Sequence, residues 1–283
     1  MQKTNTFYKN YELLDLGGFR KLESFSGVVV DRPAPNASGD KSLPDAVWEN
    51  ADAFYDGKEW NIRTDKIQNG WASVIDTATI ELKLSTAGQI GVFPEQAANW
   101  KWIKDAVLDQ KRTLKVFNGF GYTGVSSLFA SSSNSSVCHL DASKSAVSWA
   151  KRNVELSGLA GNDIRWLVDD VMTFLGRELK RGVKYDAFIL DPPAFGRTKD
   201  GKTWSLKKDL SLLLELTGLL LSKEPAFFVL SCHDPLMSTR QLSALLNTVN
   251  KGFRGRVESF EMALGSDNGA VLKSGLCARI KLL

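Results

Sequence analysis

Short apolar runs alternate with amphipathic segments along the chain from about residue 114 onward. Strand-like runs occur in TLKVFN, SVCHLD, IRWLVDD, YDAFIL and AFFVLSC, and each is followed by a segment with apolar residues at helical spacing. A regular alternation of strands and helices predicts right-handed crossovers and a doubly wound, mostly parallel α/β sheet. Two closing strands, in RGRVESFEMA and LCARIKLL, lie close together in the sequence and predict an antiparallel edge, which makes a seven-stranded sheet.

The first part of the chain has a different rhythm. Residues 1–90 show short β-like stretches separated by glycine and proline turns, as in YELLDLGGFRKLESFSGVVVDRP, WNIRT and ATIELKLST. A helix is hard to place there, so we predict a small, mainly antiparallel β domain over 1–90. In FPEQAANWKWIKDAVL, Trp100, Ile103 and Val107 recur at helical spacing and predict a helix that leads into a second domain over 91–283.

The composition is that of an ordinary globular protein. Of the 283 residues 43% are hydrophobic and 24% are charged, and this length suffices to bury a sizeable core. Three separate cysteines and two histidines give neither a disulfide framework nor a metal-ligand pattern, and no apolar run approaches the roughly 20 residues of a membrane span. Because the N-terminus also lacks an apolar signal core, we expect a cytoplasmic protein with no metal and no membrane partner.

The charge is mildly basic. The net charge is +4, and basic residues gather in GRTKDGKTWSLKK and in NKGFRGR. Such clusters are usually solvated surface, and they are also compatible with a polyanionic partner.

Four successive predicted strands end on polar or acidic residues. The first runs into the glycine-rich FNGFGYTG, and the next three end at Asp141, at Asp169–Asp170 and at Asp191. In a doubly wound sheet, a ligand binds beyond the carboxyl ends of the strands, near the point where the strand order reverses. This ordered set therefore predicts one ligand site.

These strand ends favour an adenosine ligand held without a phosphate clamp. Asp141 follows the glycine-rich turn at the spacing of the acid that binds ribose hydroxyls in dinucleotide folds, and one acid of Asp169–Asp170 would accept a hydrogen bond from an adenine amino group. The chain contains no GxxxxGK[ST] motif, and its glycines do not match GxGxxG. The pattern thus favours S-adenosylmethionine (SAM) over ATP and NAD.

The segment YDAFILDPPAFGR leaves its predicted strand in an unusual way. Pro192 and Pro193 can continue neither a sheet ladder nor a helix, so the chain exits in a stiff, extended form. Such an exit can simply end a strand, and it can also hold the Asp191 carboxylate and the Phe195 ring at the mouth of a site.

The set FNGFGYTG, HLDASKSAVSWAKRN, WLVDDVMTFLGRE and YDAFILDPPAFGR resembles the class I SAM-dependent methyltransferases, which share a Rossmann-like sheet. More narrowly, it is similar to the large-subunit (23S) ribosomal RNA methyltransferases that act on cytosine C5 and on guanine. GVFPEQAANWKWI and the N-terminal YELLDLGGFRKLESF resemble that group's pre-catalytic segments, so the resemblance covers nearly the whole chain. It implies SAM as cofactor, S-adenosylhomocysteine as product and a ribosomal RNA base as substrate.

The resemblance also implies roles at matching positions of the cofactor site. The loop around the methionine part of SAM would consist of Asn118, Phe120, Gly121, Tyr122, Thr123 and Gly124. Asp141 would bind the ribose hydroxyls, with Ala142 against the adenine ring. The adenine amino group would be bound by Asp170, next to Asp169.

For catalysis, the resemblance points to the proline-containing exit. The pocket shared by the methyl group and the target base would be lined by Asp191, Pro192, Pro193 and Phe195, with Asp191 also next to the cofactor. A flipped or single-stranded base needs a stacking surface and hydrogen-bonding groups on its edge, which Phe195 and the Asp191–Pro192 backbone would supply.

Cys232 distinguishes two chemistries. Methylation at C5 of cytosine requires a nucleophile that attacks C6, and the RNA enzymes use a cysteine after a late strand, where VLSCHD places Cys232. Those enzymes show a Thr-Cys-Ser context, here replaced by Ser231-Cys232-His233, and a free cysteine is commonly a buried core residue. If Cys232 is core, the acceptor is an amino or ring nitrogen. His233 would contact the substrate or lower the pKa of the thiol.

The substrate itself stays open at the level of sequence. An RNA base is the first hypothesis, and the alternatives are a protein or small-molecule substrate, or a non-catalytic binding module that keeps the cofactor fold. The sequence shows no PUA-type RNA-binding domain of the kind that some ribosomal RNA members carry at the N-terminus. We therefore expect the small β domain and the basic stretches to contact RNA, and we make no prediction of oligomeric state.

Overall fold

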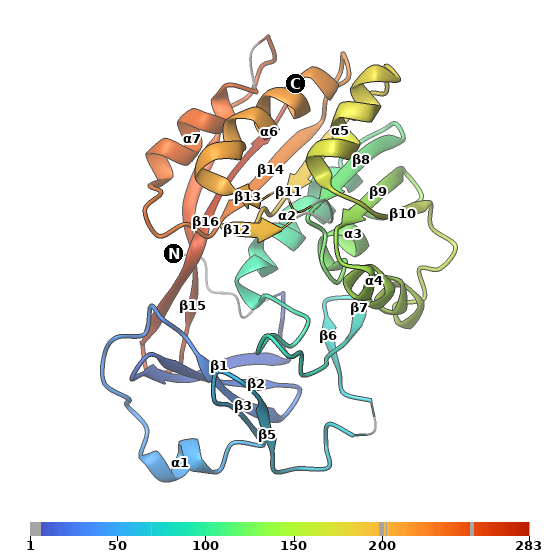
Figure 1. The fold of residues 1–283 in the computed structure, drawn as a ribbon. Coiled ribbons are helices and arrows are strands. Elements are labelled where there is room, and N and C mark those ends of the chain that lie inside the picture. The colour runs from blue at the N-terminus through green and yellow to red at the C-terminus, as the bar shows by residue number, and fades with distance from the viewer. Residues whose placement is uncertain (1–6, 69, 198–200, 202, 250–251, 283) are drawn as a thin grey trace. The chain divides into compact units, whose positions relative to one another are not determined.

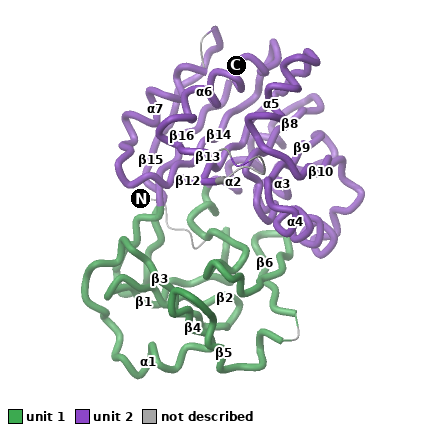
Figure 2. Tube along the Cα trace, in the orientation of Figure 1, with its two compact units in different colours: residues 1–98, 263–274 green, residues 99–262, 275–283 purple. Residues whose placement is uncertain are grey.

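The chain folds into two compact units. A computed structural model describes residues 7–68, 70–197, 201, 203–249 and 252–282. The first unit lies within residues 1–98 and 263–274, and the second within 99–262 and 275–283 (Figure 2). The first unit thus includes a segment near the C-terminal end of the chain, which no local pattern in the sequence predicts.

The first unit is built on a five-stranded sheet with the order β1-β2-β3-β4-β5 (Figure 1). Its strands are Tyr11–Gly17 (β1), Arg20–Phe25 (β2), Val28–Pro33 (β3), Ala53–Tyr55 (β4) and Trp60–Ile62 (β5). Neighbouring strands are antiparallel except β3 and β4, which are parallel. The remaining elements are the antiparallel pair Ala72–Ile75 (β6) and Ala78–Glu81 (β7), the helix Asp45–Glu49 (α1) and the 3-10 helix Pro94–Gln96 (η2). The predicted small, mainly antiparallel β fold is confirmed.

The helix α1 was not predicted, and a buried carboxylate explains it. Asp15, which is fully buried on β1, accepts hydrogen bonds from the backbone N–H of Ser42 at 3.0 Å and of Leu43 at 2.8 Å. It also accepts one from Trp48 Nε1 at 3.1 Å. A five-residue helix has little stability of its own, so these distant contacts hold it in place.

The second unit contains most of a seven-stranded sheet with the order β10-β9-β8-β11-β14-β16-β15, of which residues 263–265 and 271–274 belong to the first unit. Its strands are Leu114–Gly119 (β8), Ser135–Asp141 (β9), Ile164–Val168 (β10), Ala187–Leu190 (β11), Phe227–Cys232 (β14), Glu258–Gly265 (β15) and Val271–Lys281 (β16). The pairs from β10 to β14 are parallel, and β14 pairs with β16 in antiparallel fashion. The doubly wound sheet with an antiparallel edge is therefore confirmed.

Helices cover both faces of this sheet (Figure 1). They are Ala97–Leu108 (α2), Val125–Ala130 (α3), Lys144–Leu156 (α4), Val171–Lys180 (α5), Leu206–Leu220 (α6) and Thr239–Asn247 (α7). One face carries aromatic side chains such as Phe117 and Phe188, against which α5, α6 and α7 pack, and the other carries Val116 and Ile189, against which α2 packs. Alternate residues of each strand point to opposite faces, and because both faces are covered, the central strands β11 and β14 consist almost entirely of buried apolar residues. Within the described ranges, no helix has both the length and the apolar character needed to cross a bilayer.

Candidate functional site

The carboxyl ends of three central strands lie next to one another in the second unit. In β11, Leu190 is paired with Gly119 of β8 on one side and with Leu230 of β14 on the other. Asp191 follows directly on β11, and Cys232 ends β14. The strand register therefore brings the glycine-rich turn, the proline-containing exit and the end of β14 to one edge of the sheet.

Asp191 shares a hydrogen bond with His233, which follows the neighbouring strand β14. His233 Nε2 lies 2.9 Å from Asp191 Oδ1, and the two side chains are 31% and 29% exposed. Gly275 on β16 makes room for the imidazole, because a Cβ at this position would lie 2.7 Å from His233 Nδ1. The result is a hydrogen-bonded acid–imidazole pair that a ligand can reach. The sequence placed His233 beside the site and did not predict this partner.

The proline-containing exit is held by a short hairpin. Phe195–Arg197 (β12) pairs with Thr203–Ser205 (β13) in antiparallel fashion. Trp204 Nε1 donates a hydrogen bond to the Pro193 carbonyl at 2.7 Å, and its ring lies 5.3 Å from that of Phe120. Trp204 therefore ties the exit to the glycine-rich turn.

Sequence reasoning missed Trp204. The only signal was its position as the single aromatic residue of the basic stretch GRTKDGKTWSLKK. Residues 198–200 and 202 of that stretch lie outside the described residues, whereas Lys207 and Lys208 are exposed at the start of α6. In the second stretch, NKGFRGR, residues 250–251 lie outside the described part, and Arg254 and Arg256 are exposed.

Phe195 and the two prolines differ in exposure. Pro192 is buried and Pro193 is exposed, while the Phe195 side chain is 80% exposed. An aromatic ring this exposed, fixed on a hairpin, adds nothing to the core. It is available to stack on a planar ligand.

The turn after β8 is strained. Phe120 has a φ of 57° and Tyr122 a φ of 48°, which places two non-glycine residues in the left-handed region. The turn is held by a hydrogen bond from Gly121 N–H to the Leu140 carbonyl at 3.0 Å. Such strain costs about 1–3 kcal/mol per residue and is concentrated at functional sites.

Packing accounts for two of the glycines in this turn. A Cβ on Gly121 would lie 2.5 Å from the His139 ring, and one on Gly124 would lie 2.7 Å from the Ala150 Cβ. Gly124 also has a φ of 81°. The turn therefore packs directly against His139 of β9 and Ala150 of α4. This close packing requires glycine at both positions, whether or not a ligand binds on the other side of the turn.

Asp141, at the end of β9, holds the turn from the side. Its carboxylate accepts hydrogen bonds from the backbone N–H groups of Tyr122 at 2.9 Å and Ser143 at 2.8 Å. Burial raises the pKa of Asp141, and these two hydrogen bonds lower it only in part. The helix α4 begins next to it with Ser143 as N-cap, as predicted, and Ala142 is exposed on the connecting turn. A ligand that brought hydroxyl donors to this carboxylate would offset the cost of its burial.

Asn118 and Thr123 turn toward the interior. Both are buried, and Asn118 Nδ2 donates a hydrogen bond to Ser127 Oγ at 2.8 Å. The Thr123 carbonyl accepts from Asn153 Nδ2 at 2.9 Å. Their side chains and backbone support the turn from below, so any contact of theirs with a cofactor would run through the backbone of the turn.

The two acids after β10 have separate partners. Asp169 forms an ion pair with Arg177 and accepts a hydrogen bond from the Asp170 N–H at 2.8 Å. Asp170 is the N-cap of α5 and accepts from Thr173 N–H at 2.8 Å. The capping role explains Asp170 without a ligand, and the adenine contact remains a prediction.

Cys232 is fully buried, and burial raises the pKa of its thiol. Cys138 and Cys277 are likewise buried free thiols. A nucleophilic cysteine acts as the thiolate and needs access to its substrate. The geometry of the described residues therefore favours the acid–imidazole pair of Asp191 and His233 over the thiol as the group that meets a substrate.

Comparisons with known proteins give the family. No family model matches the chain. A SAM-dependent methyltransferase of Agrobacterium tumefaciens, known from its crystal structure, is 36% identical with a TM-score of 0.90, over 97% of this chain and 91% of that protein.

Among curated proteins, a candidate ribosomal RNA large subunit methyltransferase of Methanocaldococcus jannaschii is 26% identical over 229 residues, which is 77% of this chain and 58% of that protein. Ribosomal RNA large subunit methyltransferase I of Aeromonas salmonicida is 32% identical over 97 residues, which is 34% of this chain and 24% of that enzyme. The chain thus spans about half or less of the length of these curated relatives. The match to the Agrobacterium protein extends over nearly the whole of both chains, and the chain belongs to the SAM-dependent methyltransferases.

Proposed function

We propose that the chain binds SAM at the strand ends of its second unit and transfers the methyl group to a nitrogen of an RNA base, in ribosomal RNA. The cofactor follows from the family. The RNA substrate is supported by the names of the curated relatives, which are ribosomal RNA large subunit methyltransferases. Three free thiols fit the reducing cytoplasm, where ribosomal RNA is modified.

The described residues fit the cofactor. The strained turn with Phe120 and Tyr122 would hold the methionine part through its backbone, and Asp141 would accept from the ribose hydroxyls. Ala142 is exposed on the turn beside Asp141 and would lie against the adenine ring, near Asp170. When bound, SAM supplies a methyl group on a sulfonium, which an electron pair of the acceptor attacks.

The hydrogen-bonded pair of Asp191 and His233 is the observation that carries the proposal. The acceptor nitrogen would form a bond to the methyl carbon as the bond from that carbon to the sulfonium sulfur breaks, and the nitrogen would then lose its proton to the Asp191–His233 pair. The Asp191 carboxylate would accept a hydrogen bond from the N–H of the acceptor, and His233, 2.9 Å from it, would fix its orientation. The Phe195 ring, 80% exposed, would stack on the base.

A carbon acceptor is less well supported. Methylation at C5 of cytosine would need Cys232 as a thiolate, whereas this thiol is fully buried with a raised pKa. An acceptor nitrogen needs only hydrogen-bond acceptors and a proton acceptor, which the Asp191–His233 pair provides.

Two measurements test the proposal. Calorimetry should detect SAM binding, and Asp141→Ala should weaken it at least tenfold, the effect of about 1.4 kcal/mol from the lost charge-assisted hydrogen bonds. No binding at millimolar SAM would refute the cofactor assignment.

Mass spectrometry of nucleosides from ribosomal RNA, in cells with and without the gene, tests the substrate. We expect loss of an N-methylated base in the deletion strain, restored by the wild-type gene and not by Asp191→Ala. Loss of 5-methylcytidine would instead identify Cys232 as the nucleophile, and no change in any RNA nucleoside would favour a protein or a small molecule as substrate.

A further inference from the structure

Two exposed apolar side chains lie on the segments that leave the strand ends of the site. Among the large apolar residues that the structure describes, Leu236 and Phe195 are the most exposed, at 84% and 80%. Phe195 follows β11 and Leu236 follows β14, and these two strands are parallel neighbours in the sheet (Figure 1). Both side chains therefore belong to the edge of the sheet that carries the Asp191–His233 pair.

A fixed turn carries Leu236. The Asp234 carboxylate accepts a hydrogen bond from the Leu236 N–H at 2.9 Å, and the Asp234 carbonyl accepts one from the Met237 N–H at 3.1 Å. Pro235 restricts the backbone between them, and Met237 packs against the core. Ser238 then caps α7. The turn is thus anchored on both sides of the exposed leucine.

Packing does not explain this leucine. A side chain that stays exposed contributes almost nothing to the hydrophobic stabilisation of the fold. Single exposed leucines are common on protein surfaces, and Leu212 and Leu219, each about half exposed on α6, are examples. Leu236 differs from them because it is held by a hydrogen-bonded turn and lies three positions after His233 of the site. A fixed apolar side chain at this place is suited to contact the substrate.

Unpaired cations accompany both exposed side chains. Lys207 and Lys208 lie at the start of α6, after the hairpin that carries Phe195, and Arg240 lies at the start of α7, after Leu236. All three cations are exposed, and none forms an ion pair with another described residue. The helix dipole disfavours a cation at a helix N-terminus, so these charges do not stabilise their helices. They suit the phosphates of a nucleic acid, which both cations and helix N-termini attract.

We infer that Leu236 inserts into the base stack of an RNA stem and fills the gap left by the target base, which turns outward to Phe195 and Asp191. Proteins that distort a nucleic-acid duplex frequently insert an apolar side chain between its bases, and an enzyme that flips a base must offset the lost stacking. A base that is already unpaired would need only the Phe195 ring. The inference rests on the proposed function and deepens it, because it names a base-paired stem as the class of substrate.

Fluorescence anisotropy with labelled RNA tests this inference. The probes are a short RNA duplex and the same duplex with one central abasic nucleotide, in which the gap in the stack is already present. We expect the wild-type protein to bind the abasic duplex about tenfold more tightly, because it does not have to unstack a base. Leu236→Ala should bind both duplexes with the lower affinity. Leu236→Met keeps a long apolar side chain and should retain the preference.

Leu219→Ala is the matched control. It removes the same kind of side chain from an exposed position on α6 and should keep the wild-type preference. Because Leu236 is exposed, Leu236→Ala should also keep the wild-type midpoint of urea unfolding, which separates a lost RNA contact from a folding defect. Equal binding of the two duplexes by the wild type, binding of neither duplex, or an unchanged preference in Leu236→Ala would overturn the inference.

Methyl transfer gives a second readout. The modified position is mapped by mass spectrometry of ribosomal RNA fragments, and the target strand is then assayed with and without its complement, using radiolabelled SAM. Leu236→Ala should lower kcat/KM about tenfold for the paired strand and leave kcat/KM for the strand alone unchanged. An equal loss on both RNAs, or a target position that has no pairing partner in ribosomal RNA, would overturn the insertion into a stem.

The proposed function and this inference fail in different ways. RNA methylation that does not depend on Leu236 would refute only the insertion into a stem. A Leu236-dependent preference for the abasic duplex without SAM binding would refute the proposed function and leave Leu236 as an RNA contact.

Discussion

Acidification should destabilise the second unit through one buried histidine. His139 is fully buried on β9 beneath the strained turn, and burial lowers its pKa from 6.5 to about 3. Ser127 Oγ lies 2.9 Å from His139 Nδ1 and already accepts a hydrogen bond from Asn118 Nδ2. Ser127 and His139 thus share a hydrogen bond whose donor depends on the tautomer of the neutral ring.

Protonation of this ring is opposed within the protein. The imidazolium carries a proton on both ring nitrogens, and Nε2 has no hydrogen-bond partner among the described residues. The imidazolium charge would also lie in a site shielded from water, where no other described group compensates for the lost hydration. The folded second unit therefore keeps His139 neutral well below pH 6.5.

The magnitude follows from linkage. Between pH 6.5 and about 3 the unfolded chain binds a proton at His139 that the folded chain does not, so the free energy of unfolding falls as the pH falls. Full stability is present above pH 6.5. A pH of 5 is 1.5 pH units below 6.5, the pKa of His139 in the unfolded chain. At about 1.36 kcal/mol per pH unit, the free energy of unfolding therefore falls by about 2 kcal/mol between pH 7 and pH 5. This is a large part of a typical stability of about 5–15 kcal/mol.

Urea unfolding at pH 7 and pH 5 checks this value. His139→Gln keeps a polar side chain that does not titrate, so its loss of stability between the two pH values should be about 2 kcal/mol smaller than that of the wild type. His233→Gln removes the other histidine of the chain and should leave the loss in place. An equal pH-dependent loss in His139→Gln and in the wild type would refute the reasoning.

Four other outcomes follow from the structure. Gly121→Ala would bring a Cβ to 2.5 Å from the His139 ring, and overpacking should lower the free energy of urea unfolding by about 1–3 kcal/mol; an unchanged midpoint would contradict this. Cys232→Ser should retain methyl transfer to RNA in an assay with radiolabelled SAM, because the thiol is buried and the proposed acceptor is a nitrogen that needs no nucleophilic thiol; activity at background would contradict this. Phe195→Ala should leave stability within about 0.5 kcal/mol, because the ring is 80% exposed, and lower kcat/KM for RNA about tenfold through lost stacking; equal kcat/KM would remove it from the site. Asp15→Ala leaves three N–H donors without their acceptor and should cost about 2–4 kcal/mol in thermal unfolding of the first unit, whereas an unchanged melting temperature would show that water replaces the carboxylate.

The alternation of apolar and polar residues determined much of this protein. The strands β8, β9, β10, β11 and β14 and the helices between them were predicted from their spacing, because most of these strands are buried on both faces of the sheet and each helix on one. Ser143 was predicted as an N-cap and is one. The position of Asp141 at the end of β9 also followed from the sequence, since the end of a strand in a parallel sheet fixes where its next residue lies.

Only the tertiary structure decided which residues meet. Asp191 and His233 are 42 positions apart and form a pair because β11 and β14 are neighbours in the sheet and run in register. Trp204 joins Pro193 to Phe120 through a hairpin whose sequence carries no strong strand signal.

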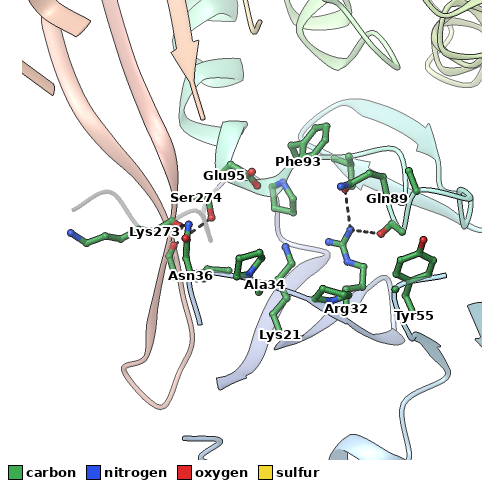
Figure 3. A pocket seen from close by; sticks show the side chains of 18 residues that line it. Lys21, Arg32, Ala34, Asn36, Tyr55, Gln89, Phe93, Glu95, Lys273 and Ser274 are labelled. Carbon is green, nitrogen blue, oxygen red and sulfur yellow. Dashed lines mark hydrogen bonds between the residues drawn. The ribbon is translucent and has the colours of Figure 1, made fainter. Parts of the chain in front are cut away.

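In the first unit, too, a cavity and the helix α1 depend on contacts between segments that are distant in sequence. The cavity is lined by Lys21 and by residues 32–36, 87–89, 92–95 and 272–274 (Figure 3), and α1 depends on the buried carboxylate of Asp15. Local periodicity records which face of a segment is buried and not what covers it. Contacts between distant segments depend on strand order, register and the few buried polar groups that need partners, and these are properties of the whole fold.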